Sequence, residues 1–186
     1  MSQLHEADIL PPWAWAEVRP ARLAAMLQHQ ESHRVRLGDG LSVLFESRET
    51  VLFRIQEVLR AEGRSGRAQV LRELAEYGPL APSDGALTAS VFVDGGSPAR
   101  ARRLAKALAT EPGTLMICGD VVRWSGRAIR GTEDPDAAVH YLRFPVARPP
   151  AGAVLALTLE GEQVTTPLPW GVTRLPAGVV ALQRAV

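Results

Sequence analysis

Cysteine is nearly absent from this chain of 186 residues, and its scarcity excludes several kinds of site. Cys118 is the only cysteine, so one chain forms no internal disulfide and no zinc or iron–sulfur site built from several cysteines. Its neighbours Leu115, Met116 and Ile117 are apolar, which predicts an inert, buried thiol.

An excess of one charge is missing as well. The chain carries 21 basic and 20 acidic residues, for a formal net charge of +1. Proteins that bind DNA or RNA usually present a strong positive field to the phosphates. We therefore expect no nucleic-acid partner.

Long apolar runs are also lacking. No 18-residue apolar stretch occurs, and the N-terminal sequence MSQLHEADIL has no basic region followed by an apolar one. Membrane spans and secretion signals need these features. We expect a cytoplasmic protein with no membrane partner.

The sequence also lacks the common catalytic motifs. The chain has no P-loop, no GxGxxG, no GxSxG and no catalytic Cys–His signature. Kinase, dehydrogenase and hydrolase activities therefore lose their usual support, and whether the protein is an enzyme stays open.

The segment that organises the chain is Leu41–Glu62, which predicts a short strand followed by a helix. Ser47 suits the N-cap of this helix and Gly63 its C-terminal end. One flank carries Phe53, Gln56, Glu57 and Arg60 at helical spacing. This flank is either an ordinary solvated surface or the polar wall of a cavity.

Hydrophobic periodicity predicts the other elements. We expect helices over 20–33, 65–77, 97–109 and 176–186. We expect strands over 34–37, 41–45, 87–94, 114–118, 121–124, 127–130, 139–146, 154–159 and 163–166. The fold class is α+β, with a helical N-terminal half packed on a mainly antiparallel sheet or small barrel. Residues 1–19 form a docked arm, 20–112 the helix-rich part and 113–186 the β part, in one compact unit.

The predicted strand Val139–Val146 carries two informative polar residues. Alternation places His140 on an apolar face and Arg143 beside Tyr141 on the other. A buried arginine needs a carboxylate or carbonyl groups, and Glu46 and Glu57 are the candidate carboxylates. The result is either a structural salt bridge or a ligand-facing cluster of Glu57, Arg60, His140 and Arg143, with Glu57 or His140 as acid or base.

Two further groups are candidates for binding. His29 and His33 are four apart on a predicted helix and could share a divalent metal, although a third ligand would have to come from elsewhere. Arg100 and Arg103, with Arg102 and Lys106, form either a solvated helix face or a site for an acidic peptide or a phosphate.

Two blocks, HRVRLGDGLSVLFESRETVLFRIQEVLRAEG (33–63) and AVHYLRF (138–144), resemble the best-marked segments of an uncharacterised bacterial family. Genes of that family are often found near genes for rubrerythrin and iron–sulfur oxidoreductases. The chain departs from the family at Phe53-Arg54 and in a shortened, proline-rich tail. The matching positions are Glu46, Arg48, Gln56, Glu57, Arg60, His140 and Arg143.

The chain also resembles the peptide-binding proteins of crocagin-type biosynthesis. That resemblance implies a protein that binds a ribosomally synthesised precursor peptide and assists cyclisation of its core. Exposed strand edges and tryptophans are suited to binding a peptide.

We therefore predict a peptide-binding maturation protein with Glu46, Gln56, Arg60, Arg143, Arg100 and Arg103 as ligand-binding residues. We expect a homodimer formed through the arm that carries Trp13 and Trp15. The alternatives are a non-catalytic accessory of a rubrerythrin or iron–sulfur redox system, and a small metalloenzyme that uses His29 and His33. The cofactor is open, and a divalent metal is the candidate.

Overall fold

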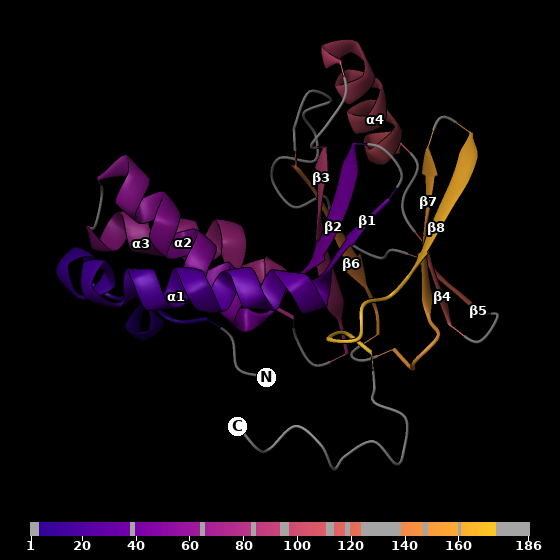
Figure 1. Ribbon diagram of the computed structural model, residues 1–186. Coiled ribbons are helices and arrows are strands. Elements are labelled where there is room, and N and C mark those ends of the chain that lie inside the picture. The colour runs from indigo at the N-terminus through magenta and orange to yellow at the C-terminus, as the bar shows by residue number, and fades with distance from the viewer. Residues whose placement is uncertain are drawn as a thin grey trace.

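The computed structural model describes residues 4–37, 40–63, 66–82, 85–93, 97–110, 114–117, 120–123, 139–146, 149–159 and 161–173. Within these residues the protein has an α+β fold, as predicted, with most helices in the N-terminal half and most strands in the C-terminal half (Figure 1). All of the strand pairs are antiparallel.

The strands in the described part of the chain form two sheets of four strands each. The first sheet has the order β1-β2-β3-β6, from β1 (Arg34–Arg36), β2 (Leu41–Phe45), β3 (Leu87–Val93) and β6 (Val139–Phe144). The second has the order β5-β4-β7-β8, from β5 (Asp120–Arg123), β4 (Thr114–Ile117), β7 (Val154–Leu159) and β8 (Glu162–Pro167). Strands from both halves of the chain thus complete the first sheet.

The larger core lies between the two sheets. One face of the first sheet contributes Val43, Val91 and Leu142, and β7 contributes Leu155 and Leu157. Helix α4 (Pro98–Thr110) covers one end of this core and contacts β3, β6 and β7 (Figure 1). Strict alternation in β6 sends His140, Leu142 and Phe144 to this buried face, as the sequence predicted.

The opposite face of the first sheet meets a helical layer. This layer consists of α1 (Pro12–His33), α2 (Arg48–Glu62) and α3 (Arg67–Tyr77), with short 3-10 turns at Glu6–Asp8 and Gly78–Leu80 (Figure 1). A second core forms here from Leu4, Val51, Ile55, Leu59, Val70 and Leu80, with Tyr141 of β6 packed against it. The first sheet is therefore the middle layer of the fold.

The predicted start of the first helix at Pro20 was wrong, because α1 begins at Pro12 and continues through Pro20. Proline suits the first turn of a helix, where its missing N–H is not needed. Pro20 lies on the exposed side of α1, so water can satisfy the carbonyl that lacks its i+4 donor. The last part of the predicted arm, residues 12–19, thus forms the first two turns of a helix.

Some predicted features lie outside the described residues, namely Cys118, the strand 127–130 and the helix 176–186. None of the helices in the described part of the chain is long and apolar enough to cross a membrane. The boundaries of the predicted three-part division stay a prediction.

Candidate functional site

The flank of α2 that was singled out from the sequence faces α1 and carries a charged cluster centred on Glu57. Arg19 of α1 donates two hydrogen bonds to the Glu57 carboxylate, from Nε and Nη2, both at 2.9 Å. Arg60 donates two more, at 3.1 and 3.2 Å, and the indole Nε1 of Trp15 donates one at 3.0 Å. Glu57 therefore joins α1 to the last turns of α2.

These donors fix the charge of Glu57. The hydrogen bonds from Arg19, helped by Arg60 and Trp15, lower the pKa of Glu57 from 4.5 to about 2. Such a carboxylate is ionised at neutral pH and is a weak base, because a proton acceptor works best when its pKa lies near the working pH. The geometry therefore favours a structural role for the Glu57 carboxylate, which holds Arg19 and Arg60 in position. It does not favour the predicted role of Glu57 as an acid or base.

Beside Glu57, the buried side chain of Gln56 holds the main chain of an extended segment. Its Oε1 accepts from the Leu10 N–H at 2.6 Å, and its Nε2 donates to the Leu10 carbonyl at 3.2 Å. The carboxamide thus makes the two hydrogen bonds that a neighbouring β-strand would make. This contact pins residues before α1 onto α2.

Two cavities adjoin the Leu10–Gln56 contact, and Leu10, Trp15 and Gln56 line both of them. The first has a volume of about 530 Å³ and the second about 480 Å³, both within the range of ligand pockets. The first is also lined by Glu6, Ile9, Pro11, Pro12, Leu59, Arg60, Gly63, Arg67 and Val70. The second is also lined by Asp8, Arg22, Ala25, Met26, His29, Arg48, Glu49, Leu52 and Phe53.

Both cavities combine apolar walls with charged rims. The charged residues that line the first cavity are Glu6, Arg60 and Arg67, where Arg67 pairs with Glu6 at 3.0 Å and Arg60 pairs with Glu57 at 3.1 Å. The Arg60 side chain is half exposed, so part of its guanidinium is open to solvent while the rest binds Glu57. The first cavity is therefore suited to an apolar group that carries a carboxylate.

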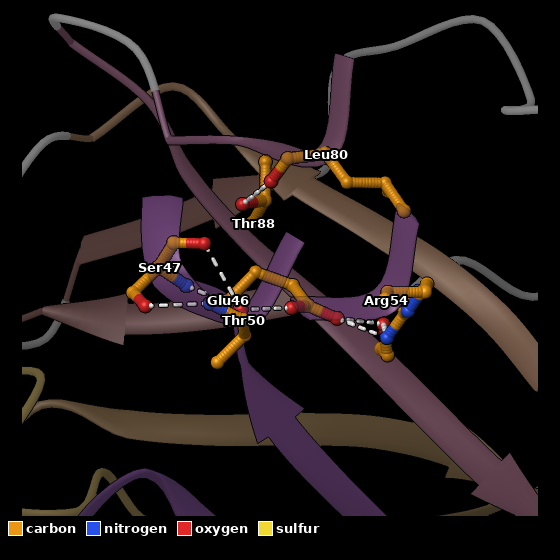
Figure 2. Close-up of polar contacts among 7 residues, drawn as sticks. Glu46, Ser47, Thr50, Arg54, Leu80 and Thr88 are labelled. Atoms are coloured by element: carbon orange, nitrogen blue, oxygen red, sulfur yellow. Dashed lines mark hydrogen bonds and ion pairs between the residues drawn. The ribbon is translucent and has the colours of Figure 1, made fainter. Parts of the chain in front are cut away.

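Glu46, another predicted ligand-binding residue, lies in a different, sealed network (Figure 2). Its side chain is 0% exposed and accepts hydrogen bonds from the hydroxyls of Thr50 and Ser90 and from Arg54 Nη2, the last at 2.6 Å. Thr50 also belongs to the N-terminal capping box of α2 with Ser47. The network fixes the start of α2 to strands β2 and β3, and it leaves the Glu46 carboxylate closed to solvent.

Arg54 completes this network on its outer side. Its guanidinium carbon lies 5.5 Å from the centre of the Tyr141 ring, and burial raises the pKa of that phenol. The two carboxylates expected to pair with Arg143 bind other arginines, because Glu46 pairs with Arg54, and Glu57 pairs with Arg19 and Arg60. Sequence spacing identified the carboxylates but not which arginine reaches them.

The proposed cluster of Glu57, Arg60, His140 and Arg143 is not assembled. Tyr141 packs against the core beneath α2, so its neighbour His140 faces the opposite side of the sheet. His140 is 2% exposed among the residues of the larger core, whereas Glu57 and Arg60 lie on the helical side. The first sheet therefore separates the two candidate acid–base residues, Glu57 and His140.

His29 and His33 do come together, as the spacing predicted. Their rings stack with centroids 3.7 Å apart, and the His33 Nδ1 lies 2.8 Å from the Ser32 hydroxyl oxygen. Burial lowers the pKa of both imidazoles. Among the residues that the structure describes, no group of three or more His, Cys, Asp or Glu side chains could hold a metal ion.

The basic face of α4 lies apart from both cavities. Arg103 is exposed and Arg100 is half-buried, and neither lines the two cavities described above. The segments that do line them are the extended N-terminal segment, α1, α2 and α3. The basic face of α4 and the two cavities thus lie on different parts of the fold.

Sequence reasoning missed Arg19 and Leu10, and it named Trp15 without placing it beside Glu57. Trp15 and Arg19 are four apart and face α2 together, but this relation is visible only when the helix is known to begin at Pro12. Leu10 acts through its backbone, which carries no sequence signal.

The geometry thus defines an α+β protein with ligand-sized cavities beside α2. The chain belongs to the family described as "Protein of unknown function (DUF3501)", whose model matches residues 3–165. No curated protein matches it.

A solved structure supports the fold. The chain is similar to the crystal structure of a "novel protein of unknown function" from Burkholderia pseudomallei K96243, with a TM-score of 0.72. The two are 22% identical, and the match covers 90% of this chain and 93% of the other. At this identity the likeness shows the fold alone.

Proposed function

We propose that this protein binds a peptide, the precursor of a ribosomally synthesised natural product, in the two cavities beside α2. The observation that carries the proposal is the Gln56–Leu10 contact, in which a side chain between two ligand-sized cavities already holds an extended main chain. The resemblance to crocagin-type proteins supplies the class of peptide.

The chemistry of the first cavity supports a peptide with apolar and acidic side chains. Ile9, Leu59 and Val70 offer apolar contacts, and Arg60 and Arg67 offer donors for a carboxylate. Glu57 holds Arg60 in place through two hydrogen bonds and so reduces the entropy that ligand binding would cost.

A strand edge offers a second place for the peptide. Strand β8 ends the order of the second sheet, and its residues are alternately exposed and half-buried. An extended peptide can add to such an edge through main-chain hydrogen bonds. We favour the cavities because they add side-chain pockets and fixed charges to main-chain contacts.

Calorimetric titration with each short peptide encoded beside the gene tests the proposal. We expect saturable micromolar binding, weakened about tenfold or more by Arg60→Ala because a charge-assisted hydrogen bond is lost. Arg72→Ala is the matched control, since Arg72 is exposed on α3 and lines neither cavity.

Arg143→Ala separates the cavity site from the cluster that the sequence suggested. It should leave the affinity unchanged, because Arg143 lies on β6 and lines neither cavity. Binding of none of the peptides would refute the proposed function. Equal affinity of the wild type and the Arg60→Ala variant would refute its location.

A further inference from the structure

Helix α1 presents a continuous apolar stripe to solvent. Trp13 is 70% exposed and Leu27 is 58% exposed, and Ala16, Pro20 and Ala24 between them are exposed as well. At 100° per residue these five positions fall within an arc of about 80° on the helix. We call this set the α1 stripe.

Neither of the two cores formed by the described residues uses the α1 stripe. The buried residues of α1 include Trp15 and Met26, on the side that faces α2, where Arg19 binds Glu57. No member of the stripe belongs to either hydrophobic core. Figure 1 shows α1 along the outside of the helical layer. A large exposed indole in an apolar patch is typical of an interface.

The spacing of the α1 stripe is symmetric. The intervals from Trp13 to Leu27 are three, four, four and three residues, with Pro20 at the centre. When two such helices pack antiparallel about Pro20, Trp13 of one faces Leu27 of the other, and Ala16 faces Ala24. A patch that is complementary to itself after a two-fold rotation is the requirement for a symmetric dimer interface.

We propose that a second copy of this chain covers the α1 stripe, so that two α1 helices pack antiparallel across a two-fold axis near Pro20. The small side chains of Ala16 and Ala24 let the helices approach closely, and each Trp13 covers the Leu27 of the partner copy. The stripe itself contains no charged residue to bury. Binding of a different protein would not require the symmetric spacing of the α1 stripe.

The interface is small. One pair of helices of this length buries less than about 1,200 Å², the lower end of stable interfaces, so we expect a weak dimer that dissociates on dilution. The cavities face α2, on the other side of α1, and stay accessible in this arrangement. The dimer is therefore independent of the proposed peptide binding.

Light scattering on the full chain over a range of concentrations gives the first test. We expect a mass that rises toward two chains, and a single-chain mass at every concentration for Trp13→Glu and for Leu27→Glu. Leu71→Glu is the control, because Leu71 is exposed on α3 outside the stripe, and it should dimerise as the wild type does. A wild type that stays monomeric, or a dimer insensitive to both stripe variants, would overturn the proposal.

Crosslinking tests the orientation. In a Cys118→Ser background, chains with Ala16→Cys and chains with Ala24→Cys should form a disulfide-linked dimer when they are mixed and mildly oxidised. Each variant alone should give little covalent dimer, because position 16 faces position 24 of the partner copy. Covalent dimers from each variant alone, with none added by mixing, would indicate parallel helices and contradict the proposal.

Discussion

Glu46 and Glu57 are both carboxylates that bind arginine beside α2, yet their surroundings differ. Glu46 is wholly buried and receives its donors from Thr50, Ser90 and Arg54. Glu57 is 22% exposed and holds Arg19 and Arg60, the second of which reaches into a cavity. Burial thus assigns the first network to the fold and leaves the second open to a ligand.

Breaking the sealed network should have the largest effect. Arg54→Met leaves the Glu46 carboxylate buried without its cation, which costs about 3–5 kcal/mol of unfolding free energy. Urea unfolding measures this loss. Pairing Arg54→Met with Glu46→Leu should recover much of the stability, since no buried charge remains. If Arg54→Met alone were as stable as the wild type, the described burial of Glu46 would be contradicted.

Gln56→Leu breaks the contact between the two cavities. It leaves the N–H and carbonyl of Leu10 without their side-chain partners and should cost about 1–3 kcal/mol in urea unfolding. The matched control is Gln28→Leu, since Gln28 is exposed on α1. Equal stability of Gln56→Leu and Gln28→Leu would contradict the role of this contact in fixing the N-terminal segment.

Acid should weaken the open network. The pKa of Glu57 is about 2 in the folded protein and 4.5 when unperturbed, so its stabilising effect is complete above pH 4.5 and is lost as the pH falls toward 2. Because the arginines are partly exposed, we expect about 1 kcal/mol. Between pH 7 and pH 3, the Glu57→Gln variant should lose less free energy of unfolding, measured in urea, than the wild type loses. The exposed Glu17→Gln variant should match the wild type.

The stacked histidines should give the smallest effect, at higher pH. Burial lowers the pKa of His29 and His33 below 6.5, so the unfolded chain binds more protons and stability falls as the pH drops below 6.5. The double variant His29→Gln/His33→Gln should flatten the change in the urea midpoint between pH 7 and pH 5. The same slope in wild type and double variant would refute this assignment.

The sequence predicted the fold class and most elements because their periodicity is local. The Ser47 cap, the Gly63 end of α2 and the alternation that buries His140 all follow from spacing along one segment. The start of α1 was missed because a proline is typical of the first turn of a helix. Whether a helix continues through a proline such as Pro20 depends on its exposure, which tertiary packing sets.

The site was predictable only in part. Gln56, Glu57 and Arg60 were identified because they lie on one helix, where spacing fixes which side chains are neighbours. Alternation placed His140 and Arg143 on opposite faces of one strand, but which of these faces meets α2 is a tertiary property. The pairing of Glu57 with Arg19 likewise depends on how two helices pack.

Amide hydrogen exchange with and without the bound precursor peptide tests the central claim, that the open flank of α2 is the ligand site. The account predicts added protection in residues 9–19, 59–63 and 66–70, which line the first cavity or lie next to it, and little change at residues 44–54 around Glu46. Protection confined to β8 or to the region around Glu46 would contradict it.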